Sequence, residues 1–391
     1  MPRDGRCPFD PPPELGGTRD EGRLTSVRLG DGTVAWLVPH YADQRSLITD
    51  KRLSSDASLP GYPHEGRIPD GANRIGFILM DDPEHARLRR MVTAPFSHRR
   101  IRAMRPRVQE LTDRLIDDML AGPQPADLVE AFALPLPSLV ICELLGVPYT
   151  EHGFFQECSR IMIDRRSSAD ERGAASGRLA EYLAELVQRK STEPGDDLLT
   201  GLAERVTAGE LTADDAAGIG VLLLVAGHET TANMIALGTL ALLENPGQLA
   251  LLRDHSDDEQ VVNGAVEELL RYLTVTHNGR RRVALEDIEF ADHTIRAGEG
   301  VIFPNDIGNR DPEVYDRPDD LDLTRDARHH LAFGFGVHLC LGLTLARMEL
   351  QVVYGTLYRR IPTLAAAEPL SDVAFKHDGS VYGVHRLLVT W

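Results

Sequence analysis

The sequence predicts a mainly α protein with a small β part. Helical periodicity recurs from about residue 83 to residue 272 and returns near the C-terminus, with clusters rich in Gly and Pro between the segments. Strand-like alternation is confined to Thr25–Val38, Arg280–Ile302 and the tail. We find no repeat and no long linker. We therefore expect one domain over residues 1–391, with residues 1–20 as an irregular N-terminal segment.

The first half of the chain divides at its glycines and prolines. Thr25–Val38 carries a Gly-Asp-Gly turn between alternating residues, which predicts a β-hairpin. Residues 54–79 hold several Gly and Pro with little periodicity, so they are interpreted as a long loop. Pro83 then opens a helix with Glu84 in its first turn. Further helices are predicted around 97–121, 136–145, 151–163, 174–190 and 196–206.

The longest helical pattern is Leu211–Leu243. Thr212 resembles an N-cap because acids follow it in the first turn, and Pro246 is expected to close the helix. Its middle is apolar nearly all round, so we expect it to be buried. Two more helices are predicted at residues 257–272 and 341–359, and the stretch to Trp391 has a strand-like pattern.

Composition excludes several classes of protein. The 391 residues are 42% apolar and 26% charged, an ordinary globular balance, and the formal charge of −18 argues against nucleic acid or an anionic membrane as the main partner. The four cysteines contain no CxxC pair, which argues against iron–sulfur and structural zinc sites. The N-terminus has no signal-peptide h-region, and the strongest apolar run is about Ile219–Ala226. We expect a soluble, cytoplasmic monomer.

The most specific segment is Phe333–Gly342, in which Cys340 lies in a glycine-bracketed loop directly before an amphipathic helix. Glycines allow backbone to approach a large flat ligand closely. Free N–H groups and the dipole at the helix start favour a thiolate. These are the requirements for a cysteine that ligates haem iron. The alternative is a buried structural cysteine in a glycine-rich turn, which a bare Gly-x-x-x-Cys would favour but this ten-residue pattern does not.

This segment resembles the haem-binding signature of cytochromes P-450, the haem-thiolate monooxygenases. The resemblance runs from about residue 20 to the C-terminus and is strongest to soluble actinomycete members. It implies the P-450 fold, with about a dozen helices and a small β-rich part, and heme b (iron protoporphyrin IX) with Cys340 as its proximal thiolate ligand. The residues that match the signature are Phe333, Gly334, Gly336, His338, Cys340 and Gly342.

A second motif lies in the middle of the long helix, at residues 226–231. Thr230 can bond the carbonyl of Ala226 and bend the helix, and Gly227 leaves room for a small ligand. The segment resembles the family's oxygen-activation motif, which implies that Thr230 orients protons and that Glu229 relays them. A kinked helix without chemistry is the alternative. A zinc-protease interpretation fails because position 232 is Ala.

The resemblance also assigns residues that hold the haem and its surroundings. Glu268 and Arg271 share a helix face and correspond to the family's buried structural clamp, with a third partner expected from residues 310–325. Further expected contacts with the cofactor are Phe333, Gly334, Ala226, Gly227 and Gly342. The two haem carboxylates require cations, and the family positions correspond to His85, Arg89, Arg282 and His338, with a register doubt of one or two residues at Arg282.

The chain carries no reductase of its own, because Gly334 and Gly336 are not followed by the third glycine of a dinucleotide fingerprint. The resemblance therefore implies electrons from NAD(P)H through a ferredoxin reductase and a ferredoxin, with O2 as co-substrate. A basic run after Phe96 is a candidate docking face for an acidic ferredoxin, although a solvated helix face explains it equally well. Its members are Arg99, Arg100, Arg102 and Arg105.

The expected reaction is hydroxylation or epoxidation of a sizeable lipophilic molecule. By family correspondence the distal pocket is walled by residues 54–79, 154–190, 221–227, 274–278 and 381–384. Polar residues in these segments suggest a secondary metabolite such as a polyketide, macrolide or polyene; they are His64, Arg67, Arg74, His277 and Asn278. The alternatives are a broad-specificity xenobiotic hydroxylase, a peroxygenase or oxidative-coupling variant of the family, and a haem sensor or carrier without turnover.

Overall fold

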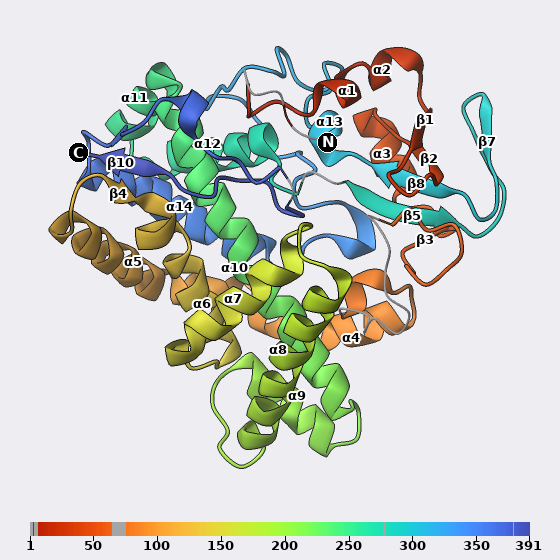
Figure 1. The fold of residues 1–391 in the computed structure, drawn as a ribbon, viewed down its shortest axis with the longest axis horizontal. Helices are drawn as coiled ribbons and strands as arrows, with labels where there is room; N and C mark the ends of the chain where they lie inside the picture. Colours follow the sequence, from red (N-terminus) through yellow and green to blue (C-terminus); the bar gives the residue numbers. More distant parts are fainter. Residues whose placement is uncertain (1–2, 4–6, 65–75, 277–278, 378) are drawn as a thin grey trace.

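We describe a computed structural model of the chain, which covers residue 3 and residues 7–64, 76–276, 279–377 and 379–391. Figure 1 shows a helical body crossed by one long helix, with a small sheet to one side. The helices are α1 (Pro13–Gly16), α2 (Thr18–Glu21), α3 (Tyr41–Leu47), α4 (Glu84–Thr93), α5 (His98–Ala121), α6 (Pro135–Leu145), α7 (His152–Ile163), α8 (Ala169–Lys190), α9 (Leu198–Thr207), α10 (Ala213–Leu243), α11 (Pro246–Asp254), α12 (Glu259–Leu273), α13 (Asn305–Gly308) and α14 (Leu343–Arg360).

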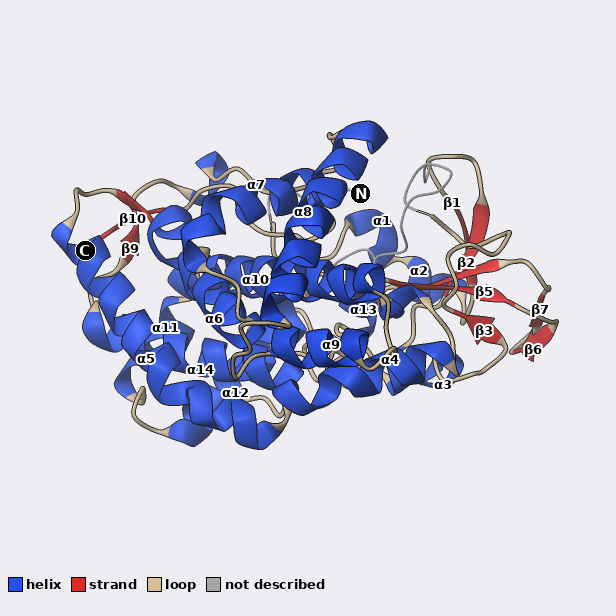
Figure 2. Cartoon of the chain, turned by 90° about the horizontal axis from the view of Figure 1, so that it is seen from below, coloured by secondary structure: helices blue, strands red, loops and turns tan. Residues whose placement is uncertain are grey.

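The strands form small sheets at opposite ends of the helical body (Figure 2). The larger sheet has the order β1-β2-β8-β5-β3, and the predicted hairpin is its antiparallel β1–β2 pair. The second sheet has the order β4-β10-β9, and β6 pairs with β7. The strands are β1 (Thr25–Arg28), β2 (Val34–Leu37), β3 (Leu53–Ser54), β4 (Ala126–Asp127), β5 (Arg280–Ala284), β6 (Ile288–Phe290), β7 (His293–Ile295), β8 (Gly300–Phe303), β9 (Ala365–Ala366) and β10 (Leu388–Thr390).

The long helix α10 is the centre of the fold. Thr212 caps it, because its hydroxyl accepts from the Asp215 N–H while the Asp215 carboxylate accepts from the Thr212 N–H. The helix packs against α6, α8 and α14. Its length and composition would suffice for a membrane span, but 78% of its most apolar window is buried inside the protein, as expected for a core helix.

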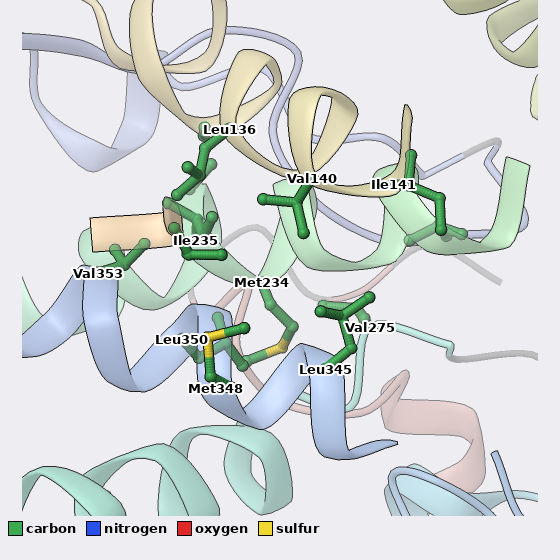
Figure 3. Close-up of a cluster of buried hydrophobic side chains, with 14 of the residues drawn as sticks. Leu136, Val140, Ile141, Met234, Ile235, Val275, Leu345, Met348, Leu350 and Val353 are labelled. Atoms are coloured by element: carbon green, nitrogen blue, oxygen red, sulfur yellow. The ribbon is translucent and has the colours of Figure 1, made fainter. Parts of the chain in front are cut away.

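A close contact between α10 and α14 determines how near the two helices pack to each other. Figure 3 shows side chains of α6, α10 and α14 interleaved in three layers, among them Ile141, Met234 and Leu350. The hydroxyl of Tyr354 donates to the carbonyl of Met234 at 2.8 Å, and it passes over Gly238, where a Cβ would lie only 2.1 Å away. The glycine therefore permits α14, and the loop that precedes it, to lie close to α10.

The expected end of the long helix before Pro246 is confirmed, since α10 ends at Leu243 and Pro246 begins α11, a position that proline tolerates well. Two other expectations about elements are wrong. Helix α8 begins five residues earlier than predicted, since Ser168 and Glu171 form a capping box that extends it to Ala169. The N-terminal segment is not wholly irregular, since α1 and most of α2 fall within residues 1–20.

Candidate functional site

Cys340 lies at the bottom of a cavity of about 420 Å³, between a tight loop and the start of α14. The loop is held by a hydrogen bond from the Cys340 N–H to the Phe333 carbonyl at 2.9 Å. Gly334 and Gly336 both have φ near +75°, a conformation that favours glycine. The local sequence thus builds the turn that presents the sulfur to the cavity.

Burial and nearby charges act in opposite directions on the pKa of the Cys340 thiol. Burial raises the pKa of the Cys340 thiol, whereas the positive charge of Arg280, the N–H of Gly342 and the charges of Arg89 and Arg347 lower it. The same charges and the same N–H favour a thiolate that a metal ion would coordinate. The expected N–H donor at the helix start is therefore present, as the backbone of Gly342.

One side of the cavity is strongly cationic. Arg280, Arg281 and Arg282 of β5 all line the cavity, together with Arg89 from α4. Among the described residues, the guanidinium groups of Arg89, Arg280 and Arg282 form no ion pair with a carboxylate. Burial lowers the pKa of Arg282 to about 10, because desolvation disfavours the charged guanidinium. Arg282 thus lies where it was predicted, and Arg280 is an additional cation that the sequence analysis missed.

Two neighbouring histidines adjoin these arginines, of which His338 lines the cavity and His85 is buried behind it. Their ring centroids lie 4.1 Å apart with the ring planes tilted by 34°, and the Nε2 atom of His338 contacts the Ser55 hydroxyl at 2.9 Å. Burial and the nearby charges, with Arg282 first among them, lower the pKa of His338 to about 3. The Nε2 atom of His85 is buried without a hydrogen-bond partner among the described residues. This wall therefore provides donors and positive charge suited to an anionic group.

The one carboxyl group among the described lining residues does not neutralise that wall. Glu349 is fully buried in α14, and its Oε2 atom has no hydrogen-bond partner in the described part of the chain. Burial raises the pKa of Glu349 well above its ordinary range, and the side chain forms no ion pair with the described residues. The cavity thus combines a largely apolar lining, a cysteine sulfur and cations without a neutralising carboxylate among the described residues. A planar dianion with a central metal, which is the chemistry of haem, fits this donor set.

The opposite wall of the cavity comes from the middle of α10. Ala226, Gly227 and Thr230 line it, and the Thr230 hydroxyl donates to the Ala226 carbonyl at 2.9 Å, as predicted. The expected role of Gly227 is wrong in part, because a Cβ there would lie 2.6 Å from Cγ1 of Ile141 and not in open space. The glycine admits α6, and the neighbouring Ala226 borders the open part of the cavity.

Glu229 follows this wall but turns away from the cavity. Its side chain is 9% exposed, and its Oε2 atom accepts from Nδ2 of Asn233 at 3.4 Å. The adjacent His228 is fully buried, with Nε2 3.6 Å from Oε1 of Glu229. A carboxylate beside a cavity hydroxyl is therefore present, but its immediate partners are a histidine and an amide.

The predicted clamp is a buried bidentate ion pair. Nε and Nη2 of Arg271 donate to the two carboxylate oxygens of Glu268 at 2.7 and 2.8 Å, and both side chains are 0% exposed. Nε of Arg325 donates to Glu268 Oε1 at 3.2 Å, so the third partner comes from the expected 310–325 stretch. Nη1 of Arg271 also donates to the carbonyls of Asn309 and Pro318. The clamp therefore joins α12 to the segment that precedes the cysteine loop.

A second ion-pair cluster beneath the cysteine loop was not predicted. Nε and Nη2 of Arg347 donate to the carboxylate of Glu267, each at 2.7 Å, and Nε2 of His330 lies 3.3 Å from Glu267 Oε2. The Arg347 guanidinium also covers the Phe333 ring at 4.8 Å. The cluster thus ties α12, α14 and the cysteine loop together, and its contacts between distant segments gave no signal in the sequence.

We expect this cluster to make stability depend on pH. Burial raises the pKa of Glu267, but hydrogen bonds from His330 and Arg347 outweigh it and hold the pKa at about 2. A depressed pKa contributes stability that is present above the unfolded value near 4.3 and is lost as pH falls toward 2. Glu267→Gln should therefore lower the free energy of unfolding by about 3 kcal/mol at pH 7, and urea titrations should show this difference shrinking below pH 4. A difference that stays constant with pH would contradict the assignment.

Only part of the predicted distal pocket borders the cavity. Residues 54–79, 221–227 and 274–278 contribute, with Phe77, Leu222 and Val275 among the lining side chains. The prediction is wrong for 154–190 and 381–384, whose described residues do not line it, because α7 and α8 pack on each other and α8 packs on α10. Ile141 of α6 contributes to the wall instead.

Of the polar residues predicted in the pocket, His64 belongs to the described part of the chain. His64 does not line the cavity, and Arg67, Arg74, His277 and Asn278 lie outside the described residues. The wall away from the cations is mainly apolar, which suits a lipophilic ligand.

The basic run lies at the start of α5. Arg99 and Arg102 are exposed, Arg100 pairs with Asp196 at 2.8 Å, and Arg105 donates to Gln351 at 3.2 Å. The run is close to the cysteine loop, because Phe96 lines the cavity and a Cβ at Gly342 would lie 3.9 Å from its ring. Exposed positive charge is therefore present near Cys340.

Comparison with known proteins gives a consistent result. The Cytochrome P-450 family model matches residues 22–361. Cytochrome P-450 GfsF of Streptomyces halstedii is 56% identical over 396 residues, a match that covers 100% of this chain and 95% of that protein. The mycinamicin VIII C21 methyl hydroxylase of Micromonospora griseorubida is 39% identical over 391 residues and is matched over 100% of this chain and 99% of its own length.

The fold agrees with solved structures of the same kind. The crystal structure of GfsF matches with a TM-score of 0.92 and 55% identity, over 100% of this chain and 99% of that one. The mycinamicin hydroxylase bound to mycinamicin VIII has a TM-score of 0.88 and 37% identity, over 97% of this chain and 96% of that one. The structure of CYP105P1 in complex with filipin I has a TM-score of 0.92 and 39% identity, covering 100% and 98%.

Proposed function

The chain belongs to the cytochrome P-450 family of haem-thiolate monooxygenases, and from this premise we propose that it oxidises a sizeable lipophilic secondary metabolite with electrons from a separate ferredoxin. The observation that carries the proposal is the single cavity that joins Cys340, the cationic wall and Thr230. When bound, the haem supplies the oxygen activation, because a thiolate ligand pushes electron density to favour O–O cleavage.

In this proposal the cysteine side of the cavity holds the cofactor. Cys340 would provide the thiolate ligand, which the positive charges of Arg280, Arg89 and Arg347 favour. Arg89, Arg282, His85 and His338 would hold the two propionates through hydrogen bonds, those of the arginines being charge-assisted. These carboxylates would raise the pKa of His338 from its low value, since they offset the cations that depress it.

The wall of the cavity formed by α10 provides the groups that transfer protons, and the apolar residues around it exclude water. The Thr230 hydroxyl borders the cavity and can exchange its bond to the Ala226 carbonyl for one to a bound ligand. Glu229, the residue directly before Thr230, lies outside the cavity lining and supplies protons to that region. The apolar wall formed by Phe77, Ile141, Leu222 and Val275 limits the access of other water.

The nature of the substrate is supported by the apolar wall and by two relatives. One relative is named as a mycinamicin VIII C21 methyl hydroxylase, and a structural neighbour holds filipin I. For this chain we propose a substrate of comparable size, positioned by apolar contacts with few polar anchors. A spin-state titration of the ferric enzyme with mycinamicin VIII and filipin I, followed by product analysis with a ferredoxin and its reductase, tests this choice.

The proposed ferredoxin docks near the start of α5. Arg99 and Arg102 are exposed there, in a chain whose formal charge is −18. They form a local region of positive charge that would attract an acidic partner. The steering should weaken as salt is added, since surface charges are screened.

We expect Thr230→Ala to uncouple electron use from product formation. Without the hydroxyl, no side chain orients the protons that enter the cavity at this position. The amount of product per NAD(P)H should therefore fall by about 10²-fold, while NAD(P)H oxidation continues and peroxide accumulates. The measurement is parallel assay of NAD(P)H, peroxide and product with a substrate that shifts the spin state. Thr239→Ala is the matched control, because Thr239 is buried on the same helix outside the cavity. Coupled product formation in Thr230→Ala would overturn this role.

A further inference from the structure

The histidine next to Glu229 has a proton position that its surroundings determine. Nδ1 of His228 lies 2.7 Å from the carbonyl oxygen of Leu224, one turn earlier in α10. A carbonyl oxygen only accepts hydrogen bonds, so Nδ1 must carry a hydrogen. The ring is fully buried and meets the edge of Phe155, with the ring centroids 6.0 Å apart. The imidazole is therefore fixed in orientation and in the identity of its protonated nitrogen.

The other nitrogen of this ring faces a carboxyl group. Nε2 lies 3.6 Å from Oε1 of Glu229 and, within the described residues, has no hydrogen-bond partner. If His228 were neutral it would present a lone pair there, because its single hydrogen is on Nδ1. A lone pair opposite an ionised carboxylate leaves two buried acceptors facing each other, which is costly in free energy. One additional proton removes this repulsion, whether it is bound to Nε2 of His228 or to the carboxylate of Glu229.

Other groups near the pair do not resolve the conflict. Asn233 offers Glu229 Oε2 only a long contact of 3.4 Å, since the same amide nitrogen donates to the Glu229 carbonyl at 2.7 Å. Among the described residues, Lys376 is the other charged group that acts on His228, but it forms no ion pair with Glu229. Burial lowers the pKa of Lys376, and the charge of Glu229 opposes that change. Burial likewise lowers the pKa of His228, Glu229 raises it, and Lys376 contributes to lowering it.

We propose that His228 and Glu229 share one proton between Nε2 and the carboxylate, so that the pair is a buried proton store beside Thr230. The inference rests on the proposed roles of Glu229 and Thr230 and adds His228 as a positioning residue. When the pair releases its proton toward Thr230, neutral His228 faces a carboxylate, and the charge of Lys376 stabilises that state. A proton taken up from solvent restores the pair.

The test is spectroscopic and does not depend on turnover. The holoenzyme, in its reduced carbon monoxide complex, is labelled with ¹⁵N-histidine, and His228 is assigned by the signal lost in His228→Gln. Infrared difference spectra between wild type and Glu229→Gln report whether the carboxyl group is protonated. We expect either an imidazolium with both nitrogens protonated, or a neutral Nδ1–H ring together with a carboxyl C=O band lost in Glu229→Gln. Each of these results places one proton on the pair.

Two results would overturn the proposal: a neutral ring with no such carboxyl band, or a ring protonated only on Nε2. In His228→Gln we expect Glu229 to be ionised, so any carboxyl band seen in the wild type should be lost. His255→Gln is the matched control, because His255 makes the same Nδ1 contact to a carbonyl one turn earlier, at 3.1 Å, but is exposed. An unchanged carbon monoxide spectrum shows that each variant holds its haem. If the proton store is absent but substrate-dependent oxygenation persists, only this inference fails.

Discussion

Cys340→Ser should abolish the strongly red-shifted Soret band of the reduced carbon monoxide complex. A serine oxygen binds iron without the charge and polarisability of a thiolate, so the electron donation that favours O–O cleavage is lost. We expect product formation to fall by about 10²–10³-fold or more, the scale seen when a main electrostatic contribution to catalysis is removed. The measurement is the visible spectrum of the purified, dithionite-reduced protein, followed by product analysis.

The other cysteines provide the control for this experiment. Cys7 is half-buried, and burial raises the pKa of its thiol to about 11. It does not line the cavity, so Cys7→Ser should keep the wild-type spectrum. A red-shifted band that survives in Cys340→Ser would mean that another residue ligates the iron, and the assignment of the site would be wrong.

Glu268→Gln should have the largest effect on folding. The substitution leaves Arg271 fully buried with its charge no longer balanced, which costs about 3–5 kcal/mol. Total stability of a domain is only about 5–15 kcal/mol, so the variant should accumulate poorly and retain little haem. Arg325 should also lose its charged partner, since both arginines donate to the carboxylate of Glu268. Haem content per protein and the urea midpoint of the soluble fraction measure the effect.

An exposed pair with the same spacing provides the comparison. Arg87 donates to Glu84 through Nε at 2.9 Å and Nη2 at 2.6 Å, three residues apart as in the clamp. Both side chains are more than one-third exposed, so Glu84→Gln should change stability by about 0.5 kcal/mol or less. Equal effects of the two substitutions would show that the buried clamp does not have the structural role assigned to it.

The local features of the fold could be predicted because they depend on neighbours in the chain. Thr212 and Asp215 cap α10 through residues three apart, and Glu268 pairs with Arg271 at the same spacing. The glycines at 334 and 336 specify the turn that precedes Cys340. In each case the interacting groups lie within one turn of helix or one loop, so the pattern of residue types carries the information.

The cationic wall shows what required the three-dimensional structure. Sequence placed Arg282 there with a doubt of one or two residues, and only the folded structure shows that Arg280 and Arg281 also line the cavity. The Glu267–Arg347 pair joins residues 80 positions apart, and Arg325 reaches Glu268 from 57 positions away. No local pattern could specify these contacts, because they depend on how α12 packs against α14 and the segment before it.

The sequence by itself thus determined the helical class, the cysteine loop, the threonine on α10 and the local clamp, because each is encoded within a few residues. Tertiary structure alone decided which arginines face the cavity, that Gly227 faces Ile141, and that His228 Nε2 faces Glu229. The physical reason is that burial and charge at a site are sums over neighbours from distant segments. Only the packed fold brings those neighbours within the few ångströms at which hydrogen bonds and desolvation act.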